Sequence, residues 1–420
     1  MLRSLLACSL LPAPALLAAD FLSSFRARLE VAVRKLPDYT CEETIARSRR
    51  ASGQGAFTPR DTIRVHVGLV AGKEKYSWPD ASRFDDKELR DLVGRGIVGT
   101  GDFAAHVQRV FLSPATQFTP RGEVEQGGRK LLRYDYELPV EHSRYKLRIA
   151  PLETEVGVKG FFLADPESLN LVRLEVLVDE IPPEMGVDKV HHAIEYAGTA
   201  IGAATFVLPS SAQLTLTDLN GDEHRNEITF ASCRQYRVES TLRFDEDKPV
   251  AVKPAPAAAP SIPTNLLVEM SLESEIQPES SALGDSVRAL VTKPVRDDAR
   301  LLIPEGAVVH GRLVRVERAN LPFDHYVVGI EFHTVEMGKE RLDFFATLQD
   351  AGPANGLLRQ AKRMDPVFTK KRGTRFDILV REKPRGEGVL HWDAKRIPIR
   401  RGLKMRWLTS TPAKIAELNQ

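Results

Sequence analysis

Apolar side chains recur at every second position over much of the chain, the pattern of β-strands that bury one face. The pattern is clearest in 171–178, 189–197, 212–217 and 225–230. Asn220-Gly221 lies between the last two segments and is typical of a hairpin turn. Consecutive strands joined by short turns, without helical patterns between them, predict an antiparallel sheet rather than βαβ units.

Helical spacing appears in two places. Near the N-terminus, apolar residues three and four positions apart predict an amphipathic helix over 20–36, which Pro37 ends: Leu22, Phe25, Leu29, Val33 and Leu36. A second helix is predicted over 102–111, where Phe103, Val107 and Val110 share one side.

A tract rich in proline and alanine, 247–263, interrupts the pattern and is typical of a stiff, extended linker. Alternation resumes beyond it, in 266–273, 287–292, 308–316, 327–332 and 341–348. Shorter strand-like segments follow at 376–380 and 403–408. We therefore expect one domain over 20–246, the linker, and a second, small β-domain over 264–420 with a basic C-terminal extension.

The segment 1–19 has the features of a secretory signal peptide. Arg3 precedes an apolar run over 5–17, and Ala18-Ala19 precede Asp20. The run is shorter than the ~20 apolar residues of a spanning helix. A lipoprotein-type cut before Cys8 is the less favoured alternative, because it leaves almost no apolar region. We expect an exported protein that is periplasmic or associated with the outer membrane.

Cleavage before Asp20 leaves two cysteines, Cys41 and Cys233. A pair of cysteines in an exported chain favours a disulfide, and two buried free thiols are the alternative. Two cysteines cannot supply the four ligands of a common structural zinc site.

Charge is distributed unevenly. Residues 351–420 contain 17 Lys and Arg against 6 Asp and Glu, whereas the whole chain carries a formal net charge of only +2. This predicts a surface that binds something anionic, such as lipid head groups; a solvated face paired with acids of the same chain is the alternative. The candidate residues are Lys370, Lys371, Arg372, Lys395, Arg396, Arg400, Arg401, Lys404 and Arg406.

Three motifs resemble ligand sites without their structural context. The glycine-rich stretch 94–101 matches a dinucleotide fingerprint in letters, but no buried parallel strand precedes it. His191, His192 and Glu195 stand on one predicted strand, where the two histidines point to opposite faces. In 218–223 the glycine occupies the fourth position, whereas a calcium loop needs it at the sixth.

Catalytic signatures are also missing. The sequence contains neither a Gly-x-Ser-x-Gly elbow nor a His-Glu-x-x-His motif. We therefore expect no catalytic residue, no metal site and no cofactor. Trp392 and Trp407 in the basic segment are interpreted as core or edge aromatics, because an exported protein rarely meets nucleic acid.

The N-terminal domain resembles the lipoprotein-carrier fold of LolA-type proteins. The resemblance rests on the leading helix and on the succession 160–168 and 171–175, which reads GFFLADPES and LVRLE. It implies a curved antiparallel sheet wrapped around helices, with an apolar concave face for lipid or acyl chains. The segments around Cys41 and Cys233 also resemble a group of uncharacterised exported bacterial proteins.

The second domain is similar to the C-terminal β-domain of TrbI-type conjugation-channel proteins. The matching segments are 284–292, GDSVRALVT, and 302–311, LIPEGAVVHG. We expect a cleavable signal in this chain instead of that family's cytoplasmic segment and membrane anchor. The resemblance therefore implies only a small β-barrel-like module.

These observations predict a mainly β protein with a few helices: a curved antiparallel sheet wrapped on helices, then a small β-barrel-like domain. The function we expect is non-catalytic binding or scaffolding in the periplasm, with an apolar or lipid-like ligand in the first domain. A subunit of an envelope secretion or transport assembly is the alternative, and an unrecognised hydrolase the third. The oligomeric state stays open.

Overall fold

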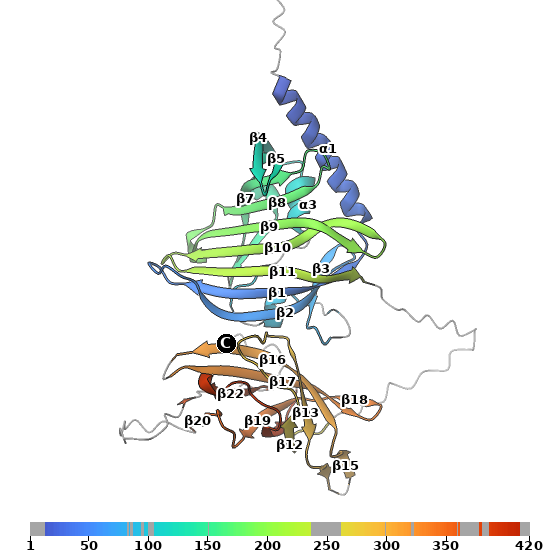
Figure 1. The fold of residues 1–420 in the computed structure, drawn as a ribbon, viewed down its shortest axis with the longest axis vertical. Helices are drawn as coiled ribbons and strands as arrows, with labels where there is room; N and C mark the ends of the chain where they lie inside the picture. The colour runs from blue at the N-terminus through green and yellow to red at the C-terminus, as the bar shows by residue number, and fades with distance from the viewer. Residues whose placement is uncertain are drawn as a thin grey trace, which may run out of the picture. The chain divides into compact units, whose positions relative to one another are not determined.

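The computed structural model describes residues 13–81, 84, 87–93, 96–99, 105–149, 151–236, 262–298, 300–320, 323–358, 360–361, 378–379 and 386–411. Two compact units are present (Figure 1). The first consists of Met1–Pro59, His66–Ser77 and Arg83–Val238, and the second of Arg60–Val65, Trp78–Ser82 and Glu239–Gln420. The expected linker, 247–263, lies almost wholly outside the described residues.

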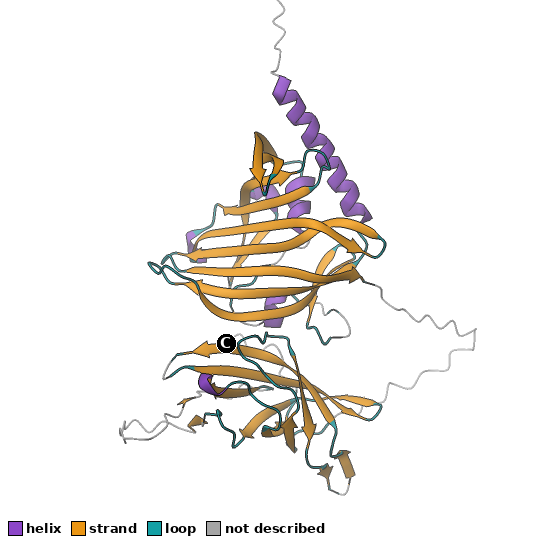
Figure 2. Cartoon of the chain, viewed as in Figure 1, coloured by secondary structure: helices purple, strands orange, loops and turns teal. Residues whose placement is uncertain are grey.

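The predicted fold class is confirmed, since strands dominate both units (Figure 2). None of the helices in the described ranges combines the length and the apolar character that a membrane crossing requires.

Most of the described first unit is one antiparallel sheet of eleven strands, in the order β3-β2-β1-β11-β10-β9-β8-β7-β5-β4, with β6 paired to β7; only residues 60–65 of β2 are counted in the second unit. Figure 1 shows β9, β10, β11, β1 and β2 lying side by side. The strands are β1 (Tyr39–Arg50), β2 (Thr58–Val70), β3 (Lys73–Ser77), β4 (Gln117–Gln126), β5 (Arg129–Leu138), β6 (Tyr145–Ile149), β7 (Leu152–Ala164), β8 (Leu171–Asp179), β9 (Val187–Ile201), β10 (Ala204–Asp218) and β11 (Glu223–Gln235).

The helices in the described part of the first unit are α1 (Ala13–Lys35), α2 (Leu89–Val93), α3 (Ala105–Leu112) and α4 (Val140–Ser143), and a 3-10 turn covers Pro183–Met185. Of these, α1 and α3 pack on the same face of the sheet, because Phe25 and Phe111 both contact Phe162 of β7. The predicted helices over 20–36 and 102–111 correspond to α1 and α3. Helix α1 starts earlier than expected, at Ala13. The predicted start of the second helix cannot be compared, because residues 101–104 lie outside the described ranges.

Aromatic rings fill the space between α1, α3 and the sheet. The Phe25 ring stacks on Phe162 of β7 with centroids 5.1 Å apart, and Phe111 of α3 meets both rings edge-on. All three side chains are fully buried. Arg26 donates to the carbonyl oxygen of Phe111 (2.9 Å), which satisfies a group left open at the end of α3. At this position α1 completes a solid core rather than lining a cavity.

A disulfide joins Cys41 on β1 to Cys233 on β11, as the sequence predicts. The two strands are antiparallel neighbours in the sheet, with Thr40 opposite Arg234 and a register shift between Thr40 and Glu42. The bond therefore links the first strand of the unit to its last strand, across 192 residues of sequence.

In the described part of the second unit, eight strands form a sheet in the order β18-β17-β16-β13-β12-β23-β19, and β22 pairs with β17. The Leu348 amide on β19 also donates to the Glu387 carbonyl beside β22 (3.3 Å). Strand β19, at one end of the order, therefore lies next to β22, which pairs with β17 near the other end, as a small barrel requires. The strands are β12 (Leu267–Leu272), β13 (Ser286–Val291), β16 (Val308–Ala319), β17 (His325–Met337), β18 (Glu340–Asp343), β19 (Ala346–Ala351), β22 (Gly388–Asp393) and β23 (Lys404–Thr409). Two minor pairs are β14 (Val295–Asp297) with β15 (Arg300–Ile303), and β20 (Gln360–Ala361) with β21 (Ile378–Leu379).

The centre of the second unit is Trp407, which is fully buried and lies edge-on to Phe332 with centroids 4.9 Å apart. A Cβ atom on Gly388 would lie only 2.3 Å from the Trp407 ring, so this position needs glycine. Trp392 is also buried. Both tryptophans are core residues, as expected.

One predicted strand was wrong. The segment 341–348 forms two strands, β18 paired with β17 and β19 paired with β23. Between them Phe344 is fully buried and its amide donates to the His333 carbonyl (3.0 Å), so the chain changes partner strand at this residue.

Candidate functional site

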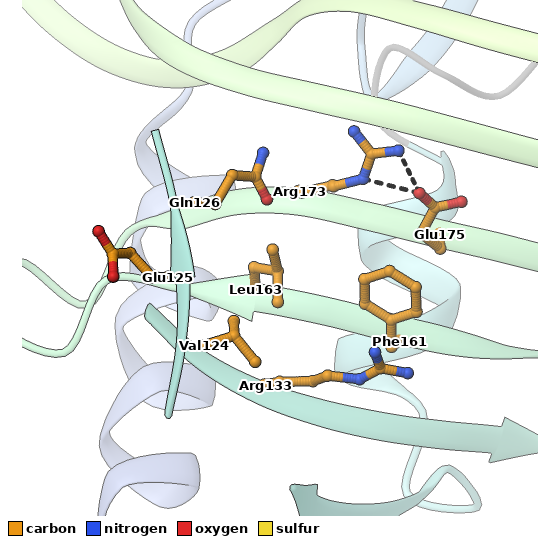
Figure 3. Close-up of a pocket in the computed structure, with 8 residues that line it drawn as sticks. All are labelled: Val124, Glu125, Gln126, Arg133, Phe161, Leu163, Arg173 and Glu175. Atoms are coloured by element: carbon orange, nitrogen blue, oxygen red, sulfur yellow. Dashed lines mark hydrogen bonds and ion pairs between the residues drawn. The ribbon is translucent and has the colours of Figure 1, made fainter. Parts of the chain in front are cut away.

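A groove of about 280 Å³ lies on the sheet face of the first unit that the helices α1 and α3 do not cover. The assignment to this face follows from strand alternation on β7, because Phe162 points to the helices while Phe161 and Leu163 point away. We call it the outer groove (Figure 3). Its lining residues are Val124, Glu125, Gln126, Arg133, Phe161, Leu163, Arg173 and Glu175.

The base of the outer groove is apolar. Leu131, Leu163 and Val172 form a buried cluster against which Val124 and Phe161 pack. Val124 belongs to β4, the edge strand of the sheet, whereas Leu163 belongs to β7. The apolar surface is therefore assembled from strands that meet only in the folded sheet.

Charged residues line the sides. Arg173 donates from Nε to Glu175 (2.7 Å) and also pairs with Glu195 on β9, while His191 contacts the other oxygen of Glu175. Burial raises the pKa of Glu175, but the hydrogen bonds from His191 and Arg173 outweigh burial and hold that pKa below its ordinary value. Glu175 is thus a buried carboxylate that stays ionised because it is paired.

Arg133 lies on the opposite side of the Phe161 ring from this network (Figure 3). Its guanidinium carbon is 4.1 Å from the Phe161 ring centroid, within cation–π range. Its Nε donates to Asp135 (3.0 Å), a carboxylate that also accepts from Arg121 (2.7 Å). Burial raises the pKa of Asp135, and the two arginines more than offset this, so the pKa is lowered overall.

Gly160 and Tyr136 hold these strands in place behind the groove. The Tyr136 hydroxyl on β5 donates to the Glu175 carbonyl on β8 (2.9 Å), passing over Gly160 on the intervening strand β7. A Cβ atom on Gly160 would lie 2.0 Å from that carbonyl oxygen. The position of Glu175 therefore depends on the absence of a side chain at residue 160.

The histidine pair behaves as strand alternation predicts. His191 points outward to Glu175, whereas His192 points inward, with its ring centroid 5.1 Å from that of His106 on α3. Glu195 pairs with Arg173 rather than with either histidine. Among the described residues, no group of three His, Cys, Asp or Glu could hold a metal ion.

The other two motifs are parts of the fold. In the glycine-rich stretch, residues 94, 95, 100 and 101 lie outside the described ranges; the Asn226 side chain donates to the Ile97 carbonyl (3.0 Å) from the sheet. Asp218 and Asp222 close the β10–β11 hairpin, in which the Gly221 amide donates to the Asp218 carbonyl (3.0 Å). This is the turn predicted at Asn220-Gly221.

Six of the nine basic candidates can be placed, all exposed and all in the second unit: Lys395, Arg396, Arg400, Arg401, Lys404 and Arg406. Lys404 and Arg406 point outward from β23 and alternate with the buried Leu403, Met405 and Trp407. In the described part of the chain only Arg406 among these six forms an ion pair, with Asp350 (2.8 Å). Lys370, Lys371 and Arg372 lie outside the described residues.

Sequence reasoning did not identify the outer groove. Its residues come from β4, β5, β7 and β8, and only the strand register brings Arg133, Phe161 and Arg173 together. One signal was present: Arg173 and Glu175 carry opposite charges two positions apart, and the other residues of this strand up to Val178 are apolar.

Comparison with known proteins gives structural neighbours that include a DUF1329 family protein and a lipoprotein-sorting domain. No family model and no curated protein matches the chain. A DUF1329 family protein from Desulfovibrio piger is 12% identical with a TM-score of 0.22, covering 52% of this chain and 92% of its own. A domain described as an outer membrane lipoprotein-sorting protein from Vibrio parahaemolyticus is 11% identical with a TM-score of 0.26, covering 54% and 95%. Both TM-scores lie below 0.5, so these likenesses carry no information about function.

Proposed function

We propose that this chain is an exported, non-catalytic binding protein of the cell envelope, and that its first unit holds an apolar or lipid-like ligand in the outer groove. The observation that carries the proposal is the groove itself, which joins an apolar base to charged sides. Binding sites for small molecules combine these two features. Its volume of about 280 Å³ suits a small ligand or one end of a longer one.

Export is supported by two features. The segment 1–19 resembles a signal peptide. The Cys41–Cys233 disulfide is typical of an oxidising compartment such as the periplasm. The contacts of α1 described above come from Phe25 and Arg26, so a mature chain starting at Asp20 keeps them.

Mass spectrometry of the protein purified from periplasmic extract tests the proposal. We expect organic extraction of the folded protein to release a lipid or apolar metabolite in a fixed ratio to protein. We also expect the preprotein to lose the segment before Asp20 on export. A protein that carries no such molecule and does not bind a neutral apolar probe would overturn the binding role.

The exposed basic residues of the second unit support a related proposal, docking on an anionic envelope surface. Each basic group near such a surface adds about 1 kcal/mol, and salt weakens the attraction. Sedimentation with mixed vesicles of phosphatidylglycerol and phosphatidylcholine compares the mature protein with a variant in which Arg400, Arg401 and Lys404 are changed to glutamine. We expect weaker sedimentation of the variant at low salt. Equal sedimentation, or binding that ignores salt, would contradict docking.

A further inference from the structure

Arg133 and Arg173, the two arginines of the outer groove, differ in how many of their guanidinium nitrogens are engaged in hydrogen bonds. Arg173 uses Nε and both terminal nitrogens on Glu175 and Glu195. Arg133 uses only Nε, which donates to Asp135, and within the described residues its two terminal nitrogens make no hydrogen bond. The side chain is 38% exposed, so these donors are accessible from the groove.

The Arg133 guanidinium is also held in one orientation. Asp135 fixes its Nε edge at 3.0 Å, and the Phe161 ring supports one face at 4.1 Å. An arginine fixed in this way loses little side-chain freedom when a ligand binds. Its two terminal nitrogens keep four N–H groups, and one from each nitrogen forms the planar fork that matches the two oxygens of a carboxylate.

Local charge favours a single negative charge on the ligand. Among the described residues, Arg121 and Arg133 form ion pairs only with Asp135, so two positive charges face one negative charge at this end of the groove. At the other end Arg173 is matched by Glu175 and Glu195. Glu125, exposed on β4, also lines the groove and disfavours a doubly charged head group.

We infer that the outer groove binds an amphipathic monocarboxylate, with the carboxylate on the terminal nitrogens of Arg133 and the alkyl chain on Leu163 and Val124. This inference rests on the proposed binding function and names the class of ligand. Phe161 separates the two parts of the site, because its face supports the guanidinium while the ring packs against the apolar base. A chain of medium length fits a groove of this volume.

Calorimetric titration with decanoate and with 1-decanol tests the inference on the full mature chain. The two probes share an alkyl chain and differ in the head group. We expect decanoate to bind at least tenfold more tightly than decanol, and this advantage to shrink at high salt. In R133Q the two probes should bind equally, and R133K should recover part of the preference because it keeps the charge without the fork.

Arg121 provides the matched control. It donates to the same Asp135 carboxylate but does not line the groove. R121Q should keep the preference for decanoate, and near-ultraviolet circular dichroism should show native packing for all three variants. The inference is overturned if R133Q keeps the preference or if R121Q loses it to the same extent.

The experiment separates this inference from the proposed function. If the wild type binds decanoate and decanol equally, the binding function stands and the carboxylate inference is wrong. If the wild type binds neither probe, the groove is not a site for apolar ligands and both proposals fail.

Discussion

The Tyr136 hydroxyl donates to the backbone carbonyl of Glu175 over a distance of 2.9 Å, across the strand that lies between them. The bond is possible because the intervening residue is Gly160. Glu175 in turn pairs with Arg173 and His191 at the side of the outer groove. The hydrogen bond from Tyr136 thus fixes the backbone of Glu175, whose side chain pairs with Arg173 and His191 on the groove face of the sheet.

Replacing Gly160 by alanine should therefore disturb both stability and the groove. The added methyl would meet the Glu175 carbonyl at 2.0 Å, so β7 and β8 must move apart. We expect G160A to lower the free energy of unfolding by about 1–3 kcal/mol, in the range of overpacked core substitutions. Urea unfolding followed by circular dichroism measures the change.

Gly198 on β9 supplies the control for this substitution. A Cβ atom there meets only a methyl group of Thr205, at 3.3 Å. G198A should change the stability by less than G160A does. Equal effects of the two substitutions would show that close approach to Glu175 is not the cause.

The disulfide should account for a large part of the stability of the first unit. Linking residues 192 positions apart removes roughly 5 kcal/mol of chain entropy from the unfolded state in the simple model, and measured effects are often smaller. We expect the double variant C41S/C233S to unfold at clearly lower urea concentration than the wild type. Thiol titration of the unfolded, unreduced mature protein, which lacks Cys8, should find no free thiol, and two thiols would contradict the bridge.

The second unit should lose stability in mild acid because of His391. This residue is buried on β22. The charged or titratable groups that act on it are His325 of β17 and Arg315 of β16. Burial, then the charges of His325 and Arg315, lower the pKa of His391 to about 4, below its ordinary value near 6.5. The unfolded chain therefore takes up a proton more readily than the folded chain between these two pH values.

Stability should then fall as the pH drops from about 6.5 to about 4, by about 2 kcal/mol once solvent screening is allowed for. The three tryptophans, Trp78, Trp392 and Trp407, all belong to the second unit, so their fluorescence reports its unfolding. H391Q should flatten the pH dependence. The control H142Q, at an exposed site on α4, should leave the pH dependence unchanged. If H391Q keeps the full dependence of stability on pH, His391 is not its cause.

Local patterns predicted much of the fold. Alternation in 171–178 and 212–217 identified β8 and β10, and the divergence of His191 and His192 followed from the same rule. The even number of mature cysteines predicted the disulfide. These features depend only on residues close in sequence or on a count.

The outer groove could not be predicted because it depends on register. Arg133 and Phe161 are far apart in sequence, and they meet only because Asp135 of β5 lies opposite Phe161 of β7. The break at Phe344 is similar, since alternation alone does not show that β18 and β19 pair with different strands. The resemblance implied a concave face for lipid, but the sheet face that α1 covers is filled by Phe25, Phe111 and Phe162, and the groove lies on the other face.

The most direct test of the account is titration of the mature protein with a neutral fluorescent apolar probe, N-phenyl-1-naphthylamine. The comparison is between V124E, which places a charge at the base of the outer groove, and V31E, which changes an exposed valine on α1 of the same unit. We predict saturable binding by the wild type and by V31E, and at least a tenfold loss of affinity in V124E with the fold intact. Equal binding by V124E and V31E would contradict the claim that the outer groove is the ligand site.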